Sequence, residues 1–228
     1  MQRRDFTVAL LTAGVSAGLA SAPAWAVLSD GDASMGVRTA LERGASAAVG
    51  LLGRSGGFDD PRVRIPLPGA LDGIAKLAAA TGQQARVDEL VAAMNRAAEA
   101  AVAVAKPLLV AAVKSMSLDD ARRIVTGGDN AATEFFAART REPLTARFLP
   151  IVARETRKVA LADKYDAIAG KVAGFGLMKK EDADLNGYVA GKALDGLFLV
   201  IGEEERKIRK DPIGTGSKLL GKVFGARN

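Results

Sequence analysis

The stretch from Asp184 to Pro212 constrains the fold more than any other part of the chain. Within it, residues 193–201 are apolar apart from Asp195 and Gly196. A helix that is apolar on nearly every side belongs at the centre of a fold, where other elements cover each face. From Glu203 onward the same stretch becomes a dense run of mixed charge. It therefore predicts a central helix that passes from the core into solvent.

Most of the remaining chain shows the spacing of helix faces. Apolar residues recur at steps of three and four, and glycines and prolines divide the pattern into segments. The first predicted helix is capped by Asp32 or Ser34 and ends at Gly53; a short helix over 68–81 and a long one over 83–116, kinked at Pro107, follow it. The next helix spans 117–125 and begins with a near capping box of Ser117 and Asp120. The last three are one capped by Asp129 that carries Phe135 and Phe136, one with Pro143 in its first turn, and one over 161–175.

Residues 58–68, with the sequence FDDPRVRIPLP, break the helical pattern. Val63, Ile65 and Leu67 alternate with polar residues or proline as in a strand. However, prolines at 66 and 68 remove hydrogen-bond donors, and no partner strand is evident elsewhere in the sequence. We interpret the segment as an extended arm laid over helices. The fold predicted for residues 27–228 is a single all-α domain, a compact multi-helix bundle with one extended proline-rich arm.

Residues 1–26 have the pattern of a cleaved export signal. Arg3 and Arg4 precede an uncharged apolar run, and Ala24 and Ala26 are the small residues that signal peptidase requires. The segment also resembles the twin-arginine signature, and an ordinary secretory signal fits it equally well. The apolar run is shorter than the roughly 20 residues of a membrane span, and no later stretch qualifies without charges. We expect cleavage after Ala26, a location in the periplasm and no transmembrane segment in the mature chain.

Composition excludes several kinds of site. The chain has no Cys and no His, so thiol nucleophiles, disulfides and the usual zinc ligands and general base are absent. The sequence predicts no cofactor and no metal site. The net charge of +6 favours anionic partners such as lipid headgroups. Aromatic residues make up only 5% of the chain and no basic stripe carries stacking residues, which argues against nucleic acid as a partner.

Several motifs occur in an order that resembles a known family. They are RIPLP at 64–68, MNRAAE at 94–99, GGDNAAT at 127–133, Tyr188-Val189 with KALDGLF at 192–198, and Glu203-Glu204 with Ile208-Arg209 and Asp211-Pro212. Together they resemble a bacterial family of exported proteins catalogued only as a domain of unknown function. The likeness spans nearly all of the chain after residue 26. It implies a helical envelope protein and supplies no catalytic residues.

Four groups of residues could carry chemistry. Asp195 is a carboxylate in an apolar helix, and either a ligand-facing acid or an ion pair with an Arg or Lys of another helix explains it, the ion pair being favoured. Arg96 and Glu99 share a helix face and, with Asn95, either line a cavity or join a hydrogen-bond network between helices. The turn at 127–129 lacks the lysine of a phosphate-binding loop, so helix capping explains it.

The charge run at 203–210 is expected to be a solvated face with i,i+4 pairs between Glu203 and Lys207 and between Glu205 and Arg209. Glu204 and Ile208 are predicted to be its inward-facing members. The residues that we take as candidate ligand contacts share polar character and a place beside apolar helix surface; they are Asn95, Arg96, Glu99, Tyr188, Asp195, Glu204 and Arg209.

The sequence leaves two classes of function open and ranks an enzyme third. The first is a binding module that encloses an apolar or lipid-like ligand between helices rich in small residues, with a cavity opening near Tyr188 and Asp195. The second is a structural or interaction protein of the cell envelope with a filled core. An enzyme is less favoured because no nucleophile and base occur in a recognisable arrangement.

Overall fold

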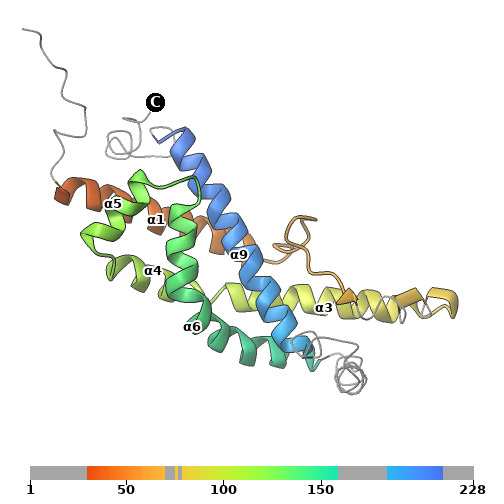
Figure 1. Ribbon diagram of the computed structural model, residues 1–228. Helices are drawn as coiled ribbons and strands as arrows, with labels where there is room; N and C mark the ends of the chain where they lie inside the picture. The colour runs from red at the N-terminus through yellow and green to blue at the C-terminus, as the bar shows by residue number, and fades with distance from the viewer. Residues whose placement is uncertain (1–29, 70–74, 77–78, 159–183, 213–228) are drawn as a thin grey trace, which may run out of the picture.

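The computed structural model describes residues 30–69, 75–76, 79–158 and 184–212, and among these it contains α-helices and no strand. The prediction of an all-α fold is confirmed. Figure 1 shows the helices crossing one another, with α9 running diagonally over α6 and α3. The helix bounds are α1 Asp30–Leu52, α3 Gln84–Val102, α4 Lys106–Lys114, α5 Leu118–Thr126, α6 Ala131–Thr156 and α9 Leu185–Lys210.

Helix α9 is central, as its sequence predicts. It packs against α6, α1 and α3, and α6 also packs against α3. Its covering is incomplete, however, because Asp195 and Leu199 are exposed. The prediction of a helix buried on every side is therefore too strong. The core around α9 includes the fully buried rings of Phe58, Phe136 and Phe148.

The predicted helix over 83–116 is two helices, because the α-helical hydrogen bonding is interrupted at 103–105, where Val104 and Ala105 donate to residues three positions back. Pro107 lies in the first turn of α4, where its missing N–H costs no hydrogen bond. Proline in the middle of a helix would lose that bond and clash with the preceding turn. A break before Pro107 therefore replaces the expected kink.

Helix α6 joins two segments that the sequence predicts as separate helices. Pro143 and Pro150 both lie inside it, so the prediction that Pro143 begins a helix is wrong. Each internal proline costs about 3 kcal/mol. Burial of an apolar stripe against α3 and α9 offsets that cost, and Figure 1 shows the axis of α6 turning part-way along. The stripe comprises Phe136, Leu144, Phe148 and Val152.

The helix ends follow local rules in part. Helix α1 begins at Asp30, before both predicted caps, and ends before Gly53 as predicted. The capping box of Ser117 and Asp120 is confirmed in α5. Asp129 does not cap α6, since the N-cap position is Asn130 and its side chain makes no capping hydrogen bond. The first turn of α6 must therefore be satisfied from elsewhere.

Two predicted helices lie wholly or partly outside the described residues. The segment 161–175 lies entirely outside them, as does the proposed export signal at 1–26. Of 68–81, residues 75–76 and 79–80 are helical, and Gly82 follows with a φ of 73°.

No single helix in the described part of the chain is long and apolar enough to cross a membrane. One bent pair, Gln84–Lys114 together with Leu118–Thr126 at an angle of 104°, has the length and composition of a membrane span.

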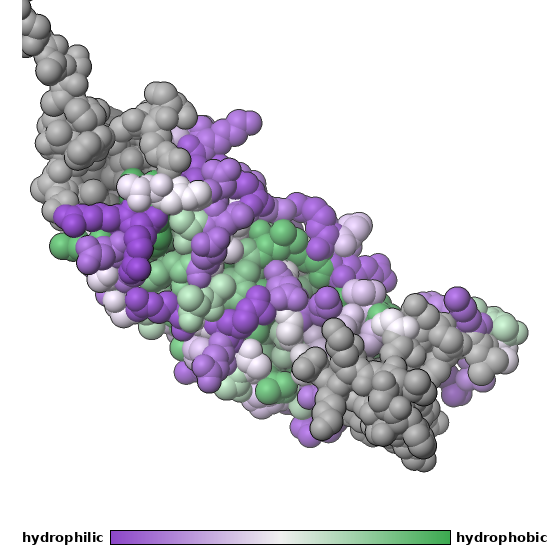
Figure 2. All heavy atoms as spheres, viewed as in Figure 1, coloured by the Kyte–Doolittle hydropathy of each residue, from purple (hydrophilic) through white to green (hydrophobic). Residues whose placement is uncertain are grey.

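The surface mixes polar and apolar side chains. Figure 2 shows apolar area along the middle of one face, bordered by hydrophilic residues. Single exposed apolar side chains are common on proteins and identify no site by themselves. Among the described residues the large ones are Met35, Leu51, Val104, Leu118 and Leu199.

Candidate functional site

Asn95 on α3 holds the arm at residues 58–68 in place. Its Nδ2 donates to the carbonyl oxygen of Ile65 at 3.0 Å, and its Oδ1 accepts from the amide of Ile65 at 2.8 Å. The same Nδ2 donates to the carbonyl oxygen of Val91 at 2.8 Å. Asn95 is buried, and its amide bonds Ile65 as a neighbouring strand would. This contact holds residues 64–68, which form neither helix nor strand, against α3, whereas residues 58 and 61–63 lie in turns.

Other predicted contact residues also meet the arm. Glu99 is buried and accepts from the amide of Phe58 at 3.4 Å. Tyr188 on α9 donates its hydroxyl to the carbonyl oxygen of Pro66 at 3.2 Å. Gly196 leaves room for the arm, because a Cβ there would lie 3.2 Å from Cε1 of Phe58. Polar residues of two helices therefore hold the backbone of the arm.

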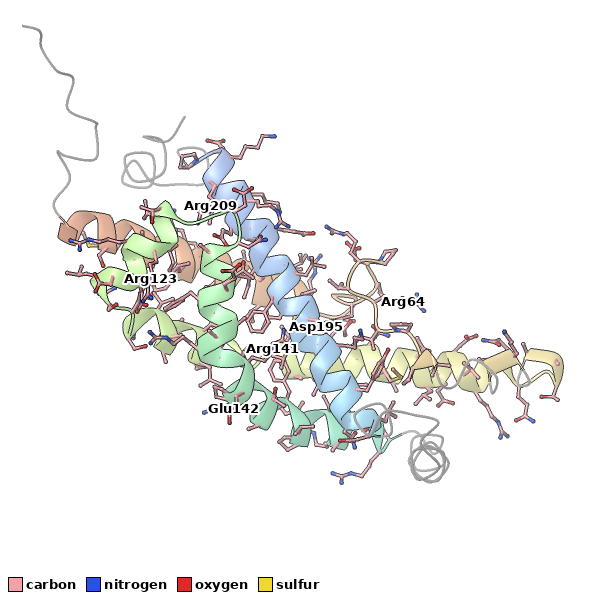
Figure 3. All side chains as sticks on the ribbon, in the orientation of Figure 1. Arg64, Arg123, Arg141, Glu142, Asp195 and Arg209 are labelled. Atoms are coloured by element: carbon pink, nitrogen blue, oxygen red, sulfur yellow. The ribbon has the colours of Figure 1, made fainter. Side chains whose placement is uncertain are left out.

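Arg96 and Asp195 are separate from this cluster. Arg96 is exposed on α3. The side chain of Asp195 is 56% exposed and forms an ion pair of 3.0 Å with Arg141 of α6 (Figure 3). The guanidinium of Arg141 also lies 5.0 Å from the centre of the Phe198 ring. Asp195 is thus engaged in an ion pair with another helix, one of the two explanations considered for it.

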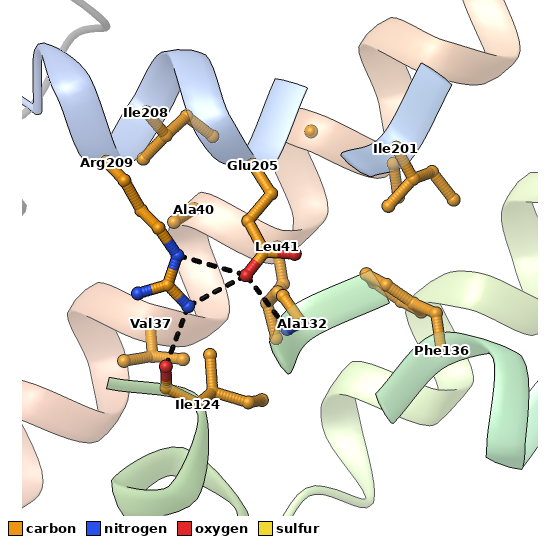
Figure 4. A pocket seen from close by; sticks show the side chains of 12 residues that line it. Val37, Ala40, Leu41, Ile124, Ala132, Phe136, Ile201, Glu205, Ile208 and Arg209 are labelled. Carbon is orange, nitrogen blue, oxygen red and sulfur yellow. Dashed lines mark hydrogen bonds and ion pairs between the residues drawn. The ribbon is translucent and has the colours of Figure 1, made fainter. Parts of the chain in front are cut away.

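A crevice lies along the C-terminal half of α9, bordered by α1, α5 and α6 (Figure 4). It is away from Tyr188 and Asp195, which are on the N-terminal half of α9. Its empty space is about 370 Å³, including space open to solvent, and the space open to the centre of a water molecule is about 20 Å³. The lining residues are mostly aliphatic: Val37, Ala40, Leu41, Gly44, Ala45, Ile124, Ala132, Phe136, Ile201, Glu205, Ile208 and Arg209.

Glu205 caps the first turn of α6 from one side of the crevice. Its Oε1 accepts from the amide of Ala132 at 3.0 Å, and its Oε2 accepts from the amide and the hydroxyl of Thr133, both at 2.9 Å. The first amides of a helix lack partners within the helix, and a carboxylate there also complements the helix dipole. Glu205 therefore supplies the cap that Asn130 does not.

Arg209 links this cap to the preceding helix. Its Nε and Nη2 donate to Oε1 of Glu205 at 3.1 and 2.7 Å, and Nη2 also donates to the carbonyl oxygen of Ile124 near the end of α5 at 2.8 Å (Figure 4). The two side chains are only 6% and 13% exposed. The pair thus ties the start of α6 and the last turn of α5 to α9. The predicted i,i+4 pairing of Glu205 with Arg209 is confirmed.

The inward-facing glutamate is Glu205 and not Glu204, which corrects the sequence prediction. The side chain of Glu204 is 22% exposed and pairs with Lys207 at 2.6 Å. Glu203 pairs with Arg62 of the arm at 2.6 Å instead of with Lys207. Ile208 is buried, as predicted. Residues 204 and 205 both fit a helical step from the buried Ile201, so spacing alone does not separate them.

The turn between α5 and α6 needs its first glycine for packing. A Cβ at Gly127 would lie 2.6 Å from both the carbonyl oxygen of Arg123 and the Cβ of Ala131. The amide of Gly127 donates to the carbonyl oxygen of Arg123, which closes the last turn of α5. The capping explanation of this turn therefore holds for Gly127 at the end of α5, and it is wrong for Asp129, which does not cap α6.

The buried carboxylates of Asp120 and Glu205 make structural contacts. The pKa of Asp120 is lowered chiefly because the amide of Ser117 donates to its carboxylate, and Arg139 and Arg123 add to the effect. No group of three or more acidic residues within the described ranges could hold a metal ion. The carboxylate of Glu205 accepts five hydrogen bonds, so both its oxygens are committed within the chain. The distinctive feature left for function is the apolar crevice beside it.

Comparison with known proteins gives a family. Residues 27–225 match the family described as "Protein of unknown function (DUF4197)". No curated protein and no solved structure matches the chain. The match spans most of the sequence, so the chain belongs to this family, and the resemblance inferred from its motifs is confirmed.

Proposed function

We propose that this member of the DUF4197 family is an exported helical protein that binds the acyl chain of a lipid-like ligand in the crevice between α1, α5, α6 and α9. The observation that carries the proposal is the lining, in which only Glu205 and Arg209 of twelve residues are charged. Binding sites for small molecules are typically apolar concavities with a few fixed polar groups. Burial of apolar ligand surface supplies roughly 25 cal/mol for each Å² removed from water.

The size of the crevice selects a narrow ligand. Ligand pockets typically enclose about 300–1,000 Å³, whereas the volume of this crevice that compares with such values is about 20 Å³, far below that range. The space open to water centres has room for only a molecule or two of water. An acyl chain must therefore widen the crevice as it enters. The α1 side of the crevice is lined by the small residues Ala40, Gly44 and Ala45, so the acyl chain would begin to enter on that side.

We place this activity in the periplasm. Residues 1–26 have the pattern of a cleaved export signal, and the family match begins at residue 27, directly after the expected cleavage site. Cleavage removes Arg3, Arg4 and Asp5, so the net charge falls from +6 to +5; this positive charge attracts anionic headgroups, and the acyl chain of an anionic lipid is the favoured ligand.

Two glycines of α1 provide a matched test. Gly44 is buried and lines the crevice, whereas Gly50 is exposed and a Cβ there would meet nothing within 4 Å. Gly44→Leu adds a side chain to the crevice, and Gly50→Leu makes the same change outside it. Titration with a fluorescent fatty acid should show at least tenfold weaker binding to Gly44→Leu and a change below twofold for Gly50→Leu. Both variants must unfold at urea concentrations close to that of the parent.

Equal affinities of both variants and the parent would exclude the crevice as the site. Absence of binding to all three would favour the second candidate, an interaction protein of the envelope without a ligand. That candidate has its own support, because Asn95, Tyr188 and Glu205 all make hydrogen bonds within the chain. Native mass spectrometry of the protein purified from its own periplasm distinguishes the two candidates. One lipid bound per chain supports the binding protein, and no bound lipid supports the interaction protein.

A further inference from the structure

The crevice has an inner end and an outer end along α9. Ile201 and Ile208 both line it, and the helix advances about 10 Å between them. Exposure of the lining increases along this path, from 2% at Ile201 to 9% at Ile208 and to 13% for the side chain of Arg209. Figure 4 shows Phe136 at the Ile201 end and Arg209 at the other. A ligand therefore enters beside Ile208 and Arg209 and advances toward Phe136.

Phe136 closes the inner end with a ring that is held in place. Its side chain lines the crevice and is fully buried. The centre of its ring lies 5.8 Å from that of Phe135 in an edge-to-face contact, and the guanidinium of Arg139 lies 5.3 Å from the centre of the Phe135 ring. Aromatic pairs have preferred geometries, which aliphatic side chains lack. We therefore expect the ring of Phe136 to keep its position while the aliphatic lining moves apart.

The inner end offers nothing to a polar headgroup. Glu205 and Arg209 are the two charged lining residues, and the lining between Glu205 and Phe136 is apolar. Both oxygens of Glu205 already accept hydrogen bonds from the first turn of α6, and Oε1 also accepts from Arg209. A headgroup buried at the inner end would lose its hydrogen bonds to water without replacement. An amphiphile must therefore enter with its methyl end first.

We propose that the crevice takes single-chain anionic amphiphiles by the methyl end and measures about eight carbons of the chain against the ring of Phe136. This inference rests on the proposed function. An extended alkyl chain advances roughly 1.25 Å per carbon, so about eight carbons fill a path of about 10 Å once the crevice has widened. Further carbons stay outside with the headgroup. Each methylene that enters should strengthen binding about fourfold.

Titration calorimetry with saturated fatty acids of increasing length, each below its micelle concentration, tests the measuring role of Phe136. Affinity for the parent should rise about fourfold per carbon up to about eight carbons and then level off. Phe136→Ala removes a ring that reaches about 4 Å past its Cβ, so the break should move to about eleven carbons. If Phe136→Ala does not fold, Phe136→Leu replaces it, with a smaller shift in the same direction.

Phe148→Ala is the matched control. Its ring is equally buried on α6 but does not line the crevice, so the break should stay where it is in the parent. A parent series without a break would overturn the proposal. So would a break that stays in place when Phe136 is shortened, or one that moves equally in Phe148→Ala.

The orientation of the ligand has a separate readout. Dodecanoic acid with a hydroxyl on its terminal carbon should bind the parent at least tenfold more weakly than dodecanoic acid, because the hydroxyl would be buried at the Phe136 end without a partner. Equal affinities would overturn entry by the methyl end. Binding without a break in the length series would refute this inference and leave the proposed function standing. No binding of any fatty acid to the parent or the variants would refute both.

Discussion

Removal of Glu205 should destabilise the protein more than removal of any neighbouring charge. Glu205→Ala deletes three hydrogen bonds to the first turn of α6 and leaves the guanidinium of Arg209, 13% exposed, without its carboxylate. Breaking a buried ion pair by removing one partner costs about 3–5 kcal/mol. We therefore expect a loss in this range in the free energy of unfolding, measured by urea denaturation followed by circular dichroism at 222 nm.

Glu204→Ala is the matched control, one residue away on the same helix. Glu204 and Lys207 are 22% and 63% exposed, and exposed pairs of this kind contribute at most about 1 kcal/mol. The double variant Glu205→Ala with Arg209→Met should lose less than the two single variants added together, because the guanidinium that loses the Glu205 carboxylate is then removed as well. A loss for Glu205→Ala no larger than that for Glu204→Ala would refute the role assigned to this pair.

Two further predictions concern packing and pH. Gly196→Ala places a Cβ 3.2 Å from the Phe58 ring and should lower the free energy of unfolding by about 1–3 kcal/mol. Gly191→Ala on the same helix is the control: its Cβ meets nothing within 4 Å, and it should raise the free energy of unfolding by about 0.5–1 kcal/mol. Equal urea midpoints for the two variants would contradict this prediction. The folded-state pKa of Asp120 is lowered, so its contribution to stability is present above its unfolded pKa of about 3.9 and is lost as pH falls through the folded value. Asp120→Asn should therefore lose less stability between pH 7 and pH 3 than the parent, and an equal loss would argue against the effect of the Ser117 amide.

Local rules in the sequence predict much of the fold. Glycine and capping patterns locate the end of α1 and the start of α5, because both depend on residues close in the chain. The same rules fail in α6, where Pro143 lies inside a continuous helix. Tertiary burial decides that case, and single-sequence spacing carries no information on which helices will cover the stripe.

The candidate site was less accessible to prediction. Asn95 and Glu99 belong to motifs that the sequence singles out, yet their contact with the arm depends on a segment about 30 to 40 residues away. Glu205 was missed as the inward residue because both glutamates after Ile201 fit the helical period. The sequence predicts Asp129 as the cap of this helix, and only the structure shows that its first turn has no side-chain cap of its own and takes one from Glu205.

The cap of α6 has a consequence for the order of folding. Glu205 follows Ala132 by 73 residues, and Arg209 follows Ile124 by 85. During synthesis the first turn of α6 therefore stays uncapped until nearly the whole chain has left the ribosome. Contacts so distant in sequence form late because a long loop must close first. A chain that stops before residue 205 has every residue of α6 and still lacks the group that completes the start of that helix.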